Sequence, residues 1–315
     1  IPIPKPGKDH SDPNNYRPIS LTSCLCKLME KMVNKRLMWF LEHSDSLSDL
    51  QCGFRKNRST IDHLVRLESF IREAFAAGEH LVAVFFDLEK AFDTTWKHGI
   101  LKDLHGLGMR GNLPLFVRAF LNNRSFQVKV GSTLSDPLDQ EEGVPQGSIL
   151  SPILFEIKIN SIVNELRQNV DGSLYVDDFL VCYRSKSSID TIERQLQLQL
   201  NKLKEWADLN GFTFSPSKTV AVHFCRRRIC VREPDLYLNS QRIEVREQAR
   251  FLGLIFDRKL NFLAHIKDLR TRCIKALRVL RVLSSREWGS DVSTLLHVYR
   301  TLIRSKLDYA SFIYG

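Results

Sequence analysis

The pair Asp177-Asp178 is the feature that most constrains what this chain can fold into. The residues around it, from Leu174 to Tyr183, are mostly apolar, β-branched or aromatic, which is typical of two buried strands. A two-residue connection between them predicts a tight hairpin, and Asp tolerates the positive φ that such a turn requires. Adjacent carboxylates in an apolar setting repel each other unless a cation joins them. An isolated Asp-Asp pair is usually a plain surface turn, so other residues must decide between the two interpretations.

A further carboxylate follows another apolar segment. Residues 81–86 form a continuous apolar run, which predicts a central strand covered on both faces, and Asp87 follows it directly. If this strand and the hairpin share one sheet, Asp87, Asp177 and Asp178 can converge. Several carboxylates form the ligand set that hard divalent cations prefer, and two such ions can promote a phosphoryl displacement. The pattern therefore indicates a metal-dependent site.

Helices alternate with strands along the chain, which favours an α+β fold with an antiparallel sheet. The predicted helices cover residues 23–42, 59–77, 114–122, 149–167, 189–210, 262–283 and 291–307, and the predicted strands include 126–130, 220–224 and short pieces within 236–257. The sheet pattern gives way to basic helices near residue 257. We therefore expect one unit over residues 1–257 and a second over residues 258–315.

Charge and composition limit the function classes. The net charge is +10, and all of the basic excess lies after residue 215, which indicates contact with a polyanion. No apolar run is long enough to span a bilayer and no signal peptide is evident, so we expect an intracellular protein without a membrane partner. The seven cysteines are scattered and show none of the usual zinc spacings, so no zinc site is predicted.

Three motifs in order resemble motifs A, B and C of reverse transcriptases. They are Phe-Phe-Asp-Leu-Glu-Lys-Ala-Phe-Asp at 85–93, Gly-Val-Pro-Gln-Gly-Ser-Ile-Leu-Ser-Pro at 143–152 and Tyr-Val-Asp-Asp at 175–178. Residues 16–21, 51–60, 211–219 and 251–254 also match flanking motifs. Together they resemble non-LTR retrotransposon polymerases of the jockey or CR1 type over nearly the whole chain. The resemblance implies a right-hand polymerase, with fingers and palm in 1–257 and a partial helical thumb in 258–315.

The resemblance assigns catalytic roles to five positions. Asp87, Asp177, Asp178 and the backbone carbonyl of Leu88 match the groups that hold two Mg²⁺ ions, for which Mn²⁺ can substitute. Lys218 matches the motif D lysine that acts as a general acid toward the pyrophosphate leaving group. In this sequence Ser215 replaces the commoner Asn of motif D, and Val176 replaces the commoner Ala before the two aspartates.

The resemblance also implies four contacts to the incoming nucleotide. Lys5 and Arg17 match basic residues of the fingers that hold the triphosphate. Phe92 matches the residue whose bulk blocks a ribose 2′-hydroxyl and so favours dNTPs. Gln146 matches the residue that lines the pocket for the dNTP and the template base.

Basic residues outside these motifs predict the contacts to nucleic acid. Arg55 and Arg58 are expected to touch template phosphates. On the helix 262–283, the cations fall within about one quadrant and the apolar positions on another face, so we expect this helix to track a primer–template duplex in a salt-dependent way. The cations are Lys267, Arg270, Arg278 and Arg281; the apolar residues are Ile266, Leu269, Cys273, Leu277 and Leu280.

The expected partners are an RNA template, a DNA primer and dNTPs, with the element's endonuclease region elsewhere in the same polyprotein. Three alternatives stay open. A viral RNA-dependent RNA polymerase shares the palm but would require a Ser-Gly-x-x-x-Thr motif B, which is absent here. A decayed or domesticated remnant would bind nucleic acid without catalysis. A group II intron maturase is a near relative.

Overall fold

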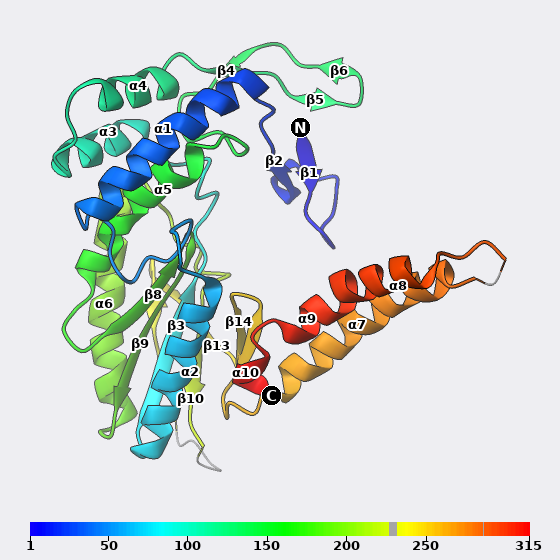
Figure 1. The fold of residues 1–315 in the computed structure, drawn as a ribbon. Coiled ribbons are helices and arrows are strands. Elements are labelled where there is room, and N and C mark those ends of the chain that lie inside the picture. Colours follow the sequence, from blue (N-terminus) through cyan, green and yellow to red (C-terminus); the bar gives the residue numbers. More distant parts are fainter. Residues whose placement is uncertain (227–231, 286) are drawn as a thin grey trace.

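The computed structural model describes residues 1–226, 232–285 and 287–315. A helical region lies above a β-sheet that is flanked by α2 (Thr60–Ala76) and α6 (Ile189–Asn210). A helical arm projects from the side of the sheet region, and the N-terminal hairpin lies between the upper region and the arm (Figure 1). Among the described residues, no helix combines the length and the apolar character needed to cross a membrane.

The central sheet has five strands in the order β13-β10-β3-β9-β8. β3 is the middle strand and pairs antiparallel with both β10 and β9, which confirms the prediction of a central strand. The outer pairing of β10 with β13 is parallel, so the sheet is mixed where a fully antiparallel one was expected. The strands are β3 (His80–Phe86), β8 (Asp171–Tyr175), β9 (Asp178–Ser185), β10 (Val220–Phe224) and β13 (Glu244–Val245).

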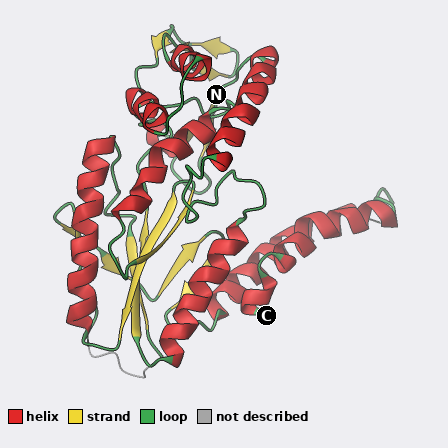
Figure 2. Ribbon diagram, turned by 60° about the vertical axis from the view of Figure 1, so that its left-hand side comes forward, coloured by secondary structure: helices red, strands yellow, loops and turns green. Residues whose placement is uncertain are grey.

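Side chains of β3 alternate between two hydrophobic cores, as a strand with both faces covered requires. Val82, Val84 and Phe86 pack into a core that includes α6. Leu81 and Phe85 pack into the opposite core, which includes α2 and the β-hairpin of β14 (Gln248–Phe251) and β15 (Leu254–Asp257). Figure 2 shows the sheet between these two layers.

The upper region is built from shorter elements around the 20-residue helix α1. Glu30 of α1 accepts hydrogen bonds from the Ser148 hydroxyl and from the amides of Ile149 and Leu150, at the start of α5. A carboxylate is stabilised at a helix N-terminus, so this contact fixes α1 to α5. The elements are β1 (Pro2–Pro4), η1 (Pro13–Asn15), β2 (Tyr16–Pro18), α1 (Cys24–His43), α3 (Lys97–Gly106), α4 (Asn112–Leu121), β4 (Ser125–Phe126), β5 (Lys129–Val130), β6 (Thr133–Leu134), β7 (Leu138–Asp139), α5 (Ser151–Asn160) and η2 (Ser161–Glu165).

The arm consists of one long helix with shorter helices folded back along it (Figure 1). The Tyr309 hydroxyl donates to the Leu252 carbonyl at 2.7 Å and lies 2.8 Å from the Thr60 hydroxyl, which ties the returning chain to the sheet region and to α2. The elements are α7 (Leu263–Leu283), α8 (Val292–Tyr299), a π-helical turn (Arg300–Arg304), α9 (Ser305–Asp308) and α10 (Ser311–Tyr314). Two small strands, β11 (Tyr237–Leu238) and β12 (Gln241–Arg242), precede β13.

Most predicted helices are confirmed, and the differences are local. The predicted helix 149–167 ends at Asn160 and continues as a 3₁₀ turn, while the predicted strand 126–130 is divided between β4 and β5. On α7 the buried residues are His265, Leu269 and Ala276, whereas Ile266 and Leu277 are exposed. The predicted apolar face is therefore only partly correct, because α7 has partners along only part of its circumference.

Glu156 is a buried acid within α5. Its side chain is fully buried, and neither carboxylate oxygen has a hydrogen-bond partner among the described residues. Desolvation raises the pKa of Glu156 to about 8, although Arg55 opposes the shift. The folded chain therefore keeps a proton that the unfolded chain loses above the ordinary pKa of 4.5.

We predict that the stability of the wild-type chain falls as the pH rises from about 4.5 to 8, because only the unfolded state then ionises Glu156. Glu156→Gln should reduce this dependence to the part that other carboxyl groups with a raised pKa, such as Asp178, contribute, and it should raise the free energy of unfolding at pH 8 by about 1–3 kcal/mol. Urea denaturation at pH 5.5 and at pH 8 measures the effect. Glu205→Gln on the exposed face of α6 is the control, and an equal effect of both variants would contradict the assignment.

Candidate active site

The hairpin that carries the two aspartates turns one residue earlier than the sequence predicted. Tyr175 pairs with Asp178, so the two loop residues are Val176 and Asp177, and Asp178 already belongs to β9. Val176 adopts a φ of 60°, so the residue in the left-handed region is a valine and not an aspartate. A β-branched residue is strained in this conformation, which costs about 1–3 kcal/mol unless surrounding contacts hold it.

Residues 50–53 provide those contacts. Leu174 donates its amide to Leu50 and accepts from the amide of Cys52, so this segment runs beside β8. The fully buried Gln51 accepts hydrogen bonds from the amide of Val176 at 3.2 Å and from that of Gly53 at 2.9 Å. A Cβ on Gly53 would lie 2.5 Å from Val176 Cγ2. Gln51 and Gly53 therefore position the turn, and sequence reasoning missed this role, although an isolated Gly is a known signal of close backbone approach.

The register of the sheet brings Asp87 to the hairpin. Phe86, the last residue of β3, pairs with Phe179, so Asp87, which follows it directly, lies opposite Asp178. Desolvation, together with the carboxylates of Asp177 and Asp87, raises the pKa of Asp178 to about 6. Desolvation and Asp87 also raise the pKa of Asp177, although solvent reaches both hairpin carboxylates. The three carboxylates therefore share one local electrostatic site.

Lys218 lies at this site through a contact with Asp87. The Lys218 Nζ atom is 3.0 Å from Asp87 Oδ2, and its side chain is 63% exposed. The amide of Ser215 donates to the Asp87 carbonyl and that of Glu89 to Thr213. These two bonds form an isolated antiparallel bridge between Leu88 and Phe214. In such a bridge the Leu88 carbonyl points away from residues 213–215.

Side-chain contacts near the carboxylates join the segment 85–93 to the segment 143–152 and to α5. The half-buried ring of Phe92 stacks on Phe155 of α5, with centroids 4.6 Å apart and an interplanar angle of 20°. The side-chain amide of Gln146 donates to Asp93 Oδ1 at 2.8 Å. The backbone carbonyl of Gln146 accepts from the backbone amide of Ser20 at 2.6 Å. Phe92 and Gln146 are therefore fixed by contacts between segments that are far apart in sequence.

The N-terminal hairpin contributes the two basic residues that the sequence singled out. Arg17 lies on β2 near Asp177 and opposes the rise in the pKa of that carboxyl. Lys5 donates to the carbonyl of Asn14. Desolvation raises the pKa of Asp93, and the charge of Lys5 opposes this rise. Both cations therefore lie on the side of the site where Asp177 and Asp93 are found.

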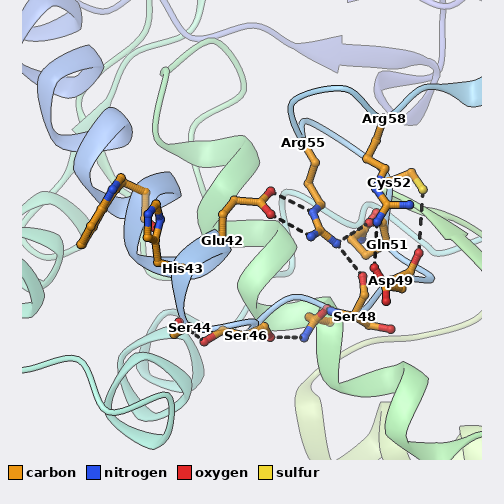
Figure 3. A network of polar contacts seen from close by, with 12 residues as sticks. Glu42, His43, Ser44, Ser46, Ser48, Asp49, Gln51, Cys52, Arg55 and Arg58 are labelled. Carbon is orange, nitrogen blue, oxygen red and sulfur yellow. Dashed lines mark hydrogen bonds and ion pairs between the residues drawn. The ribbon is translucent and has the colours of Figure 1, made fainter.

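Arg55 does not occupy the exposed position that the sequence led us to expect. Its side chain is only 8% exposed and forms a paired contact with Glu42, with further hydrogen bonds to the carbonyls of Ser48 and Gln51 (Figure 3). The prediction that Arg55 touches template phosphates is therefore corrected: its guanidinium organises the loop after α1. Arg58 is more exposed and forms an ion pair with Asp49 at 2.7 Å.

The cations of α7 lie apart from the carboxylate site, on the arm. Their side chains are all exposed, and the helix buries a different set of residues. An exposed row of cations on a helix that projects from the body can approach a polyanion without rearranging the core. The residues are Lys267, Arg270, Arg278 and Arg281.

The donor groups around Asp87 fit a hard divalent cation. Asp87, Asp177 and Asp178 supply only carboxylate oxygens, and desolvation together with the neighbouring carboxylates raises the pKa values of the hairpin pair, an effect that a bound cation would oppose. One carboxylate follows the central strand of the sheet, and a hairpin of the same sheet carries two more opposite it. A helical region lies above this sheet (Figure 1). These features define the palm of a right-hand polymerase.

Comparisons with known proteins identify the family. The family model "Reverse transcriptase (RNA-dependent DNA polymerase)" matches residues 3–256, so the chain belongs to the reverse transcriptase family. The RNA-directed DNA polymerase from mobile element jockey of Drosophila melanogaster is 30% identical over 322 residues, which cover 100% of this chain and 35% of that protein. The polymerase assigned to transposon BS of the same species is 31% identical over 319 residues, with 99% and 35% covered. The chain thus spans about a third of the length of these relatives.

Solved structures support the fold. Telomerase from Candida tropicalis, in complex with a fragment of telomeric RNA, matches with a TM-score of 0.51 at 13% identity, over 90% of this chain and 46% of that one. Telomerase from Candida albicans matches with a TM-score of 0.52 at 16% identity, over 90% of this chain and 47% of the telomerase chain. At these identities the likeness concerns the fold, and it agrees with the right-hand architecture.

We predict that Gly53→Ala displaces the turn at Val176 and lowers nucleotide incorporation by at least about tenfold, because the added Cβ would meet Val176 Cγ2 at 2.5 Å and its amide nitrogen at 2.9 Å. Gly106→Ala is the matched control, since a Cβ there meets nothing within 4 Å. Single-turnover extension assays, with circular dichroism to compare folding, measure the difference. Equal rates for both variants would show that the contact does not position the turn.

Proposed function

We propose that this chain is the polymerase domain of a non-LTR retrotransposon protein and copies an RNA template into DNA. The observation that carries the proposal is the convergence of Asp87 with the hairpin carboxylates of Asp177 and Asp178. The reaction is the attack of a primer 3′-hydroxyl on the α-phosphate of a dNTP, with release of pyrophosphate. Membership of the reverse transcriptase family supports an RNA template and a DNA product.

Two Mg²⁺ ions, for which Mn²⁺ can substitute, are the cofactors of this proposal. Asp87, Asp177, Asp178 and the Leu88 carbonyl would hold them, because these groups form an all-oxygen set at the end of the central strand. When bound, such ions lower the pKa of the attacking hydroxyl and neutralise charge on the phosphates. The protein's own contribution is to fix the carboxylates in one geometry through the β3–β9 register and the supported turn at Val176.

The nucleotide is selected by groups around Phe92. The Phe92 ring stacks on Phe155, so it resists displacement and would exclude a ribose 2′-hydroxyl. Gln146, which is held by Asp93, would line the pocket for the base pair. Arg17 and Lys5 would bind the triphosphate oxygens, since Arg suits a paired contact with phosphate and Lys provides a point charge.

Lys218 is proposed as the proton donor to the pyrophosphate leaving group. In the free chain its ammonium group lies on Asp87, and its exposed side chain has room to move to a departing phosphate. An ammonium group can act as a general acid once it is positioned against the leaving group.

We propose that residues 1–257 form the fingers and palm and that residues 258–315 form part of the thumb. The exposed cations of α7 would follow the phosphates of the primer–template duplex, and Arg58 would contact the template. The partners would be an RNA template, a DNA primer and dNTPs inside the cell. An endonuclease region would lie elsewhere in the same polyprotein.

We predict that Asp177→Asn lowers the rate of oligo(dT) primer extension on poly(rA), with dTTP and Mg²⁺, by at least about 100-fold. The reason is that the variant loses a charged metal ligand. Asp136→Asn on an exposed loop should extend at the wild-type rate. The wild-type chain should reject rUTP, and Phe92→Ala should accept it. Gel analysis of single-nucleotide addition gives all of these rates.

Two of the competing functions have a distinct outcome in this assay. Wild-type extension with rUTP in preference to dTTP would indicate an RNA-dependent RNA polymerase. Salt-sensitive duplex binding without extension would indicate a catalytically inactive remnant that binds nucleic acid. Either result would overturn the proposed function.

A further inference from the structure

The end of the central sheet remote from Asp87 carries a cluster of potential metal ligands. His223 is on β10 and Cys225 lies two residues later, so both side chains project from the same face of the sheet. Phe224 pairs with Leu81, which places His80, the first residue of β3, opposite Cys225. One ligand atom from each of these three residues lies within 4.8 Å of the other two. We propose that His80, His223 and Cys225 bind a zinc ion.

Burial and hydrogen bonding prepare the ligands for a metal. His223 and Cys225 are each only 2% exposed. His223 Nδ1 lies 3.1 Å from Glu233 Oε2, so this nitrogen donates its proton to the carboxylate and Nε2 keeps a lone pair. Carboxylate–histidine pairs of this kind orient histidine ligands of zinc. His223 Nε2 faces His80 Nδ1 at 3.0 Å, and a metal ion would replace this ring-to-ring contact with two N–metal bonds.

The surrounding charges accommodate a divalent cation. The Arg258 guanidinium lies 3.5 Å from His223 Nδ1 and would oppose a nearby cation. It is, however, paired with Glu233 at 2.6 Å and with Glu247 at 3.1 Å. With Cys225 as a thiolate, the three negative groups offset the charges of the arginine and of a zinc ion, so no net charge would be left in the cluster.

The ligand types select the metal and indicate its role. Two imidazole nitrogens and one thiolate suit Zn²⁺ and not the Mg²⁺ expected at the carboxylates, and a water molecule would complete the tetrahedron. β3 spans His80 to Phe86, which separates this cluster from Asp87 by roughly 20 Å at about 3.3 Å per residue. A zinc ion here would therefore join β3 to β10 and stabilise the sheet without touching the polymerisation site.

Cobalt substitution tests the proposal on the full chain. Co²⁺ should bind the Asp177→Asn background, chosen to weaken the carboxylate site, with one ion per chain and a thiolate-to-cobalt charge-transfer band in the near ultraviolet. Cys225→Ser should abolish the band, whereas Cys182→Ser, which removes another buried sheet cysteine, should keep it. Glu233→Gln should weaken Zn²⁺ binding by about 10- to 100-fold and leave the band in place at saturation.

A second measurement on the unmodified cluster keeps the test decisive if a variant fails to fold. Zn²⁺, but not Mg²⁺, should raise the melting temperature of the Asp177→Asn chain, and elemental analysis after gel filtration should find about one zinc per chain. Absence of the charge-transfer band in that chain, or a band that survives in Cys225→Ser, would overturn the proposal. The cluster would then be a metal-free hydrogen-bonded network of two histidines and Glu233.

Discussion

The pairing of β3 with β9 is the constraint on which the site depends. Phe86 opposite Phe179 is the last pair of this ladder, and it places Asp87 beside the hairpin carboxylates. A shift of one residue in this register would move Asp87 to the other face of the sheet. The side chains of β3 alternate between two cores, so a slip of one residue would move Val82 and Val84 into the opposite core, where Leu81 and Phe85 now pack.

The turn at Val176 shows how packing maintains a locally unfavourable conformation. A valine at a φ of 60° is strained, yet the close approach of Gly53 and the side chain of Gln51 hold the backbone there. The consequence is that Asp178 begins β9 while Asp177 remains in the loop, so the two carboxylates leave the backbone at different places. Adjacent acids can in this way face one site together with Asp87.

Sequence reasoning was correct where local patterns decide the structure. The apolar run at 81–86, the hairpin arms and the helical periodicity of residues 23–42 and 262–283 predicted the corresponding elements. It was wrong by one residue at the hairpin turn, because local preference favours Asp over Val at positive φ and only contacts from residues 50–53 reverse that preference.

Other features depend on contacts that are distant in the sequence. Arg55 lies in a polar, basic loop, where the sequence predicts a solvated cation. Its partner Glu42 is on the preceding helix, and the Arg55 side chain is buried against it. The cluster of His80, His223 and Cys225 has no zinc-site spacing, since two strands supply the ligands from positions far apart in the chain. Both cases require the tertiary fold before they can be recognised.

Crystals of the chain with a primer–template, a dNTP and Mn²⁺ would test the central claim most directly, through anomalous scattering from the manganese. We expect manganese peaks held jointly by Asp87, directly after β3, and Asp177 of the hairpin, with the Lys218 ammonium displaced from Asp87. Manganese bound by only one of these two segments, or an intact Lys218–Asp87 ion pair with nucleotide in place, would contradict it.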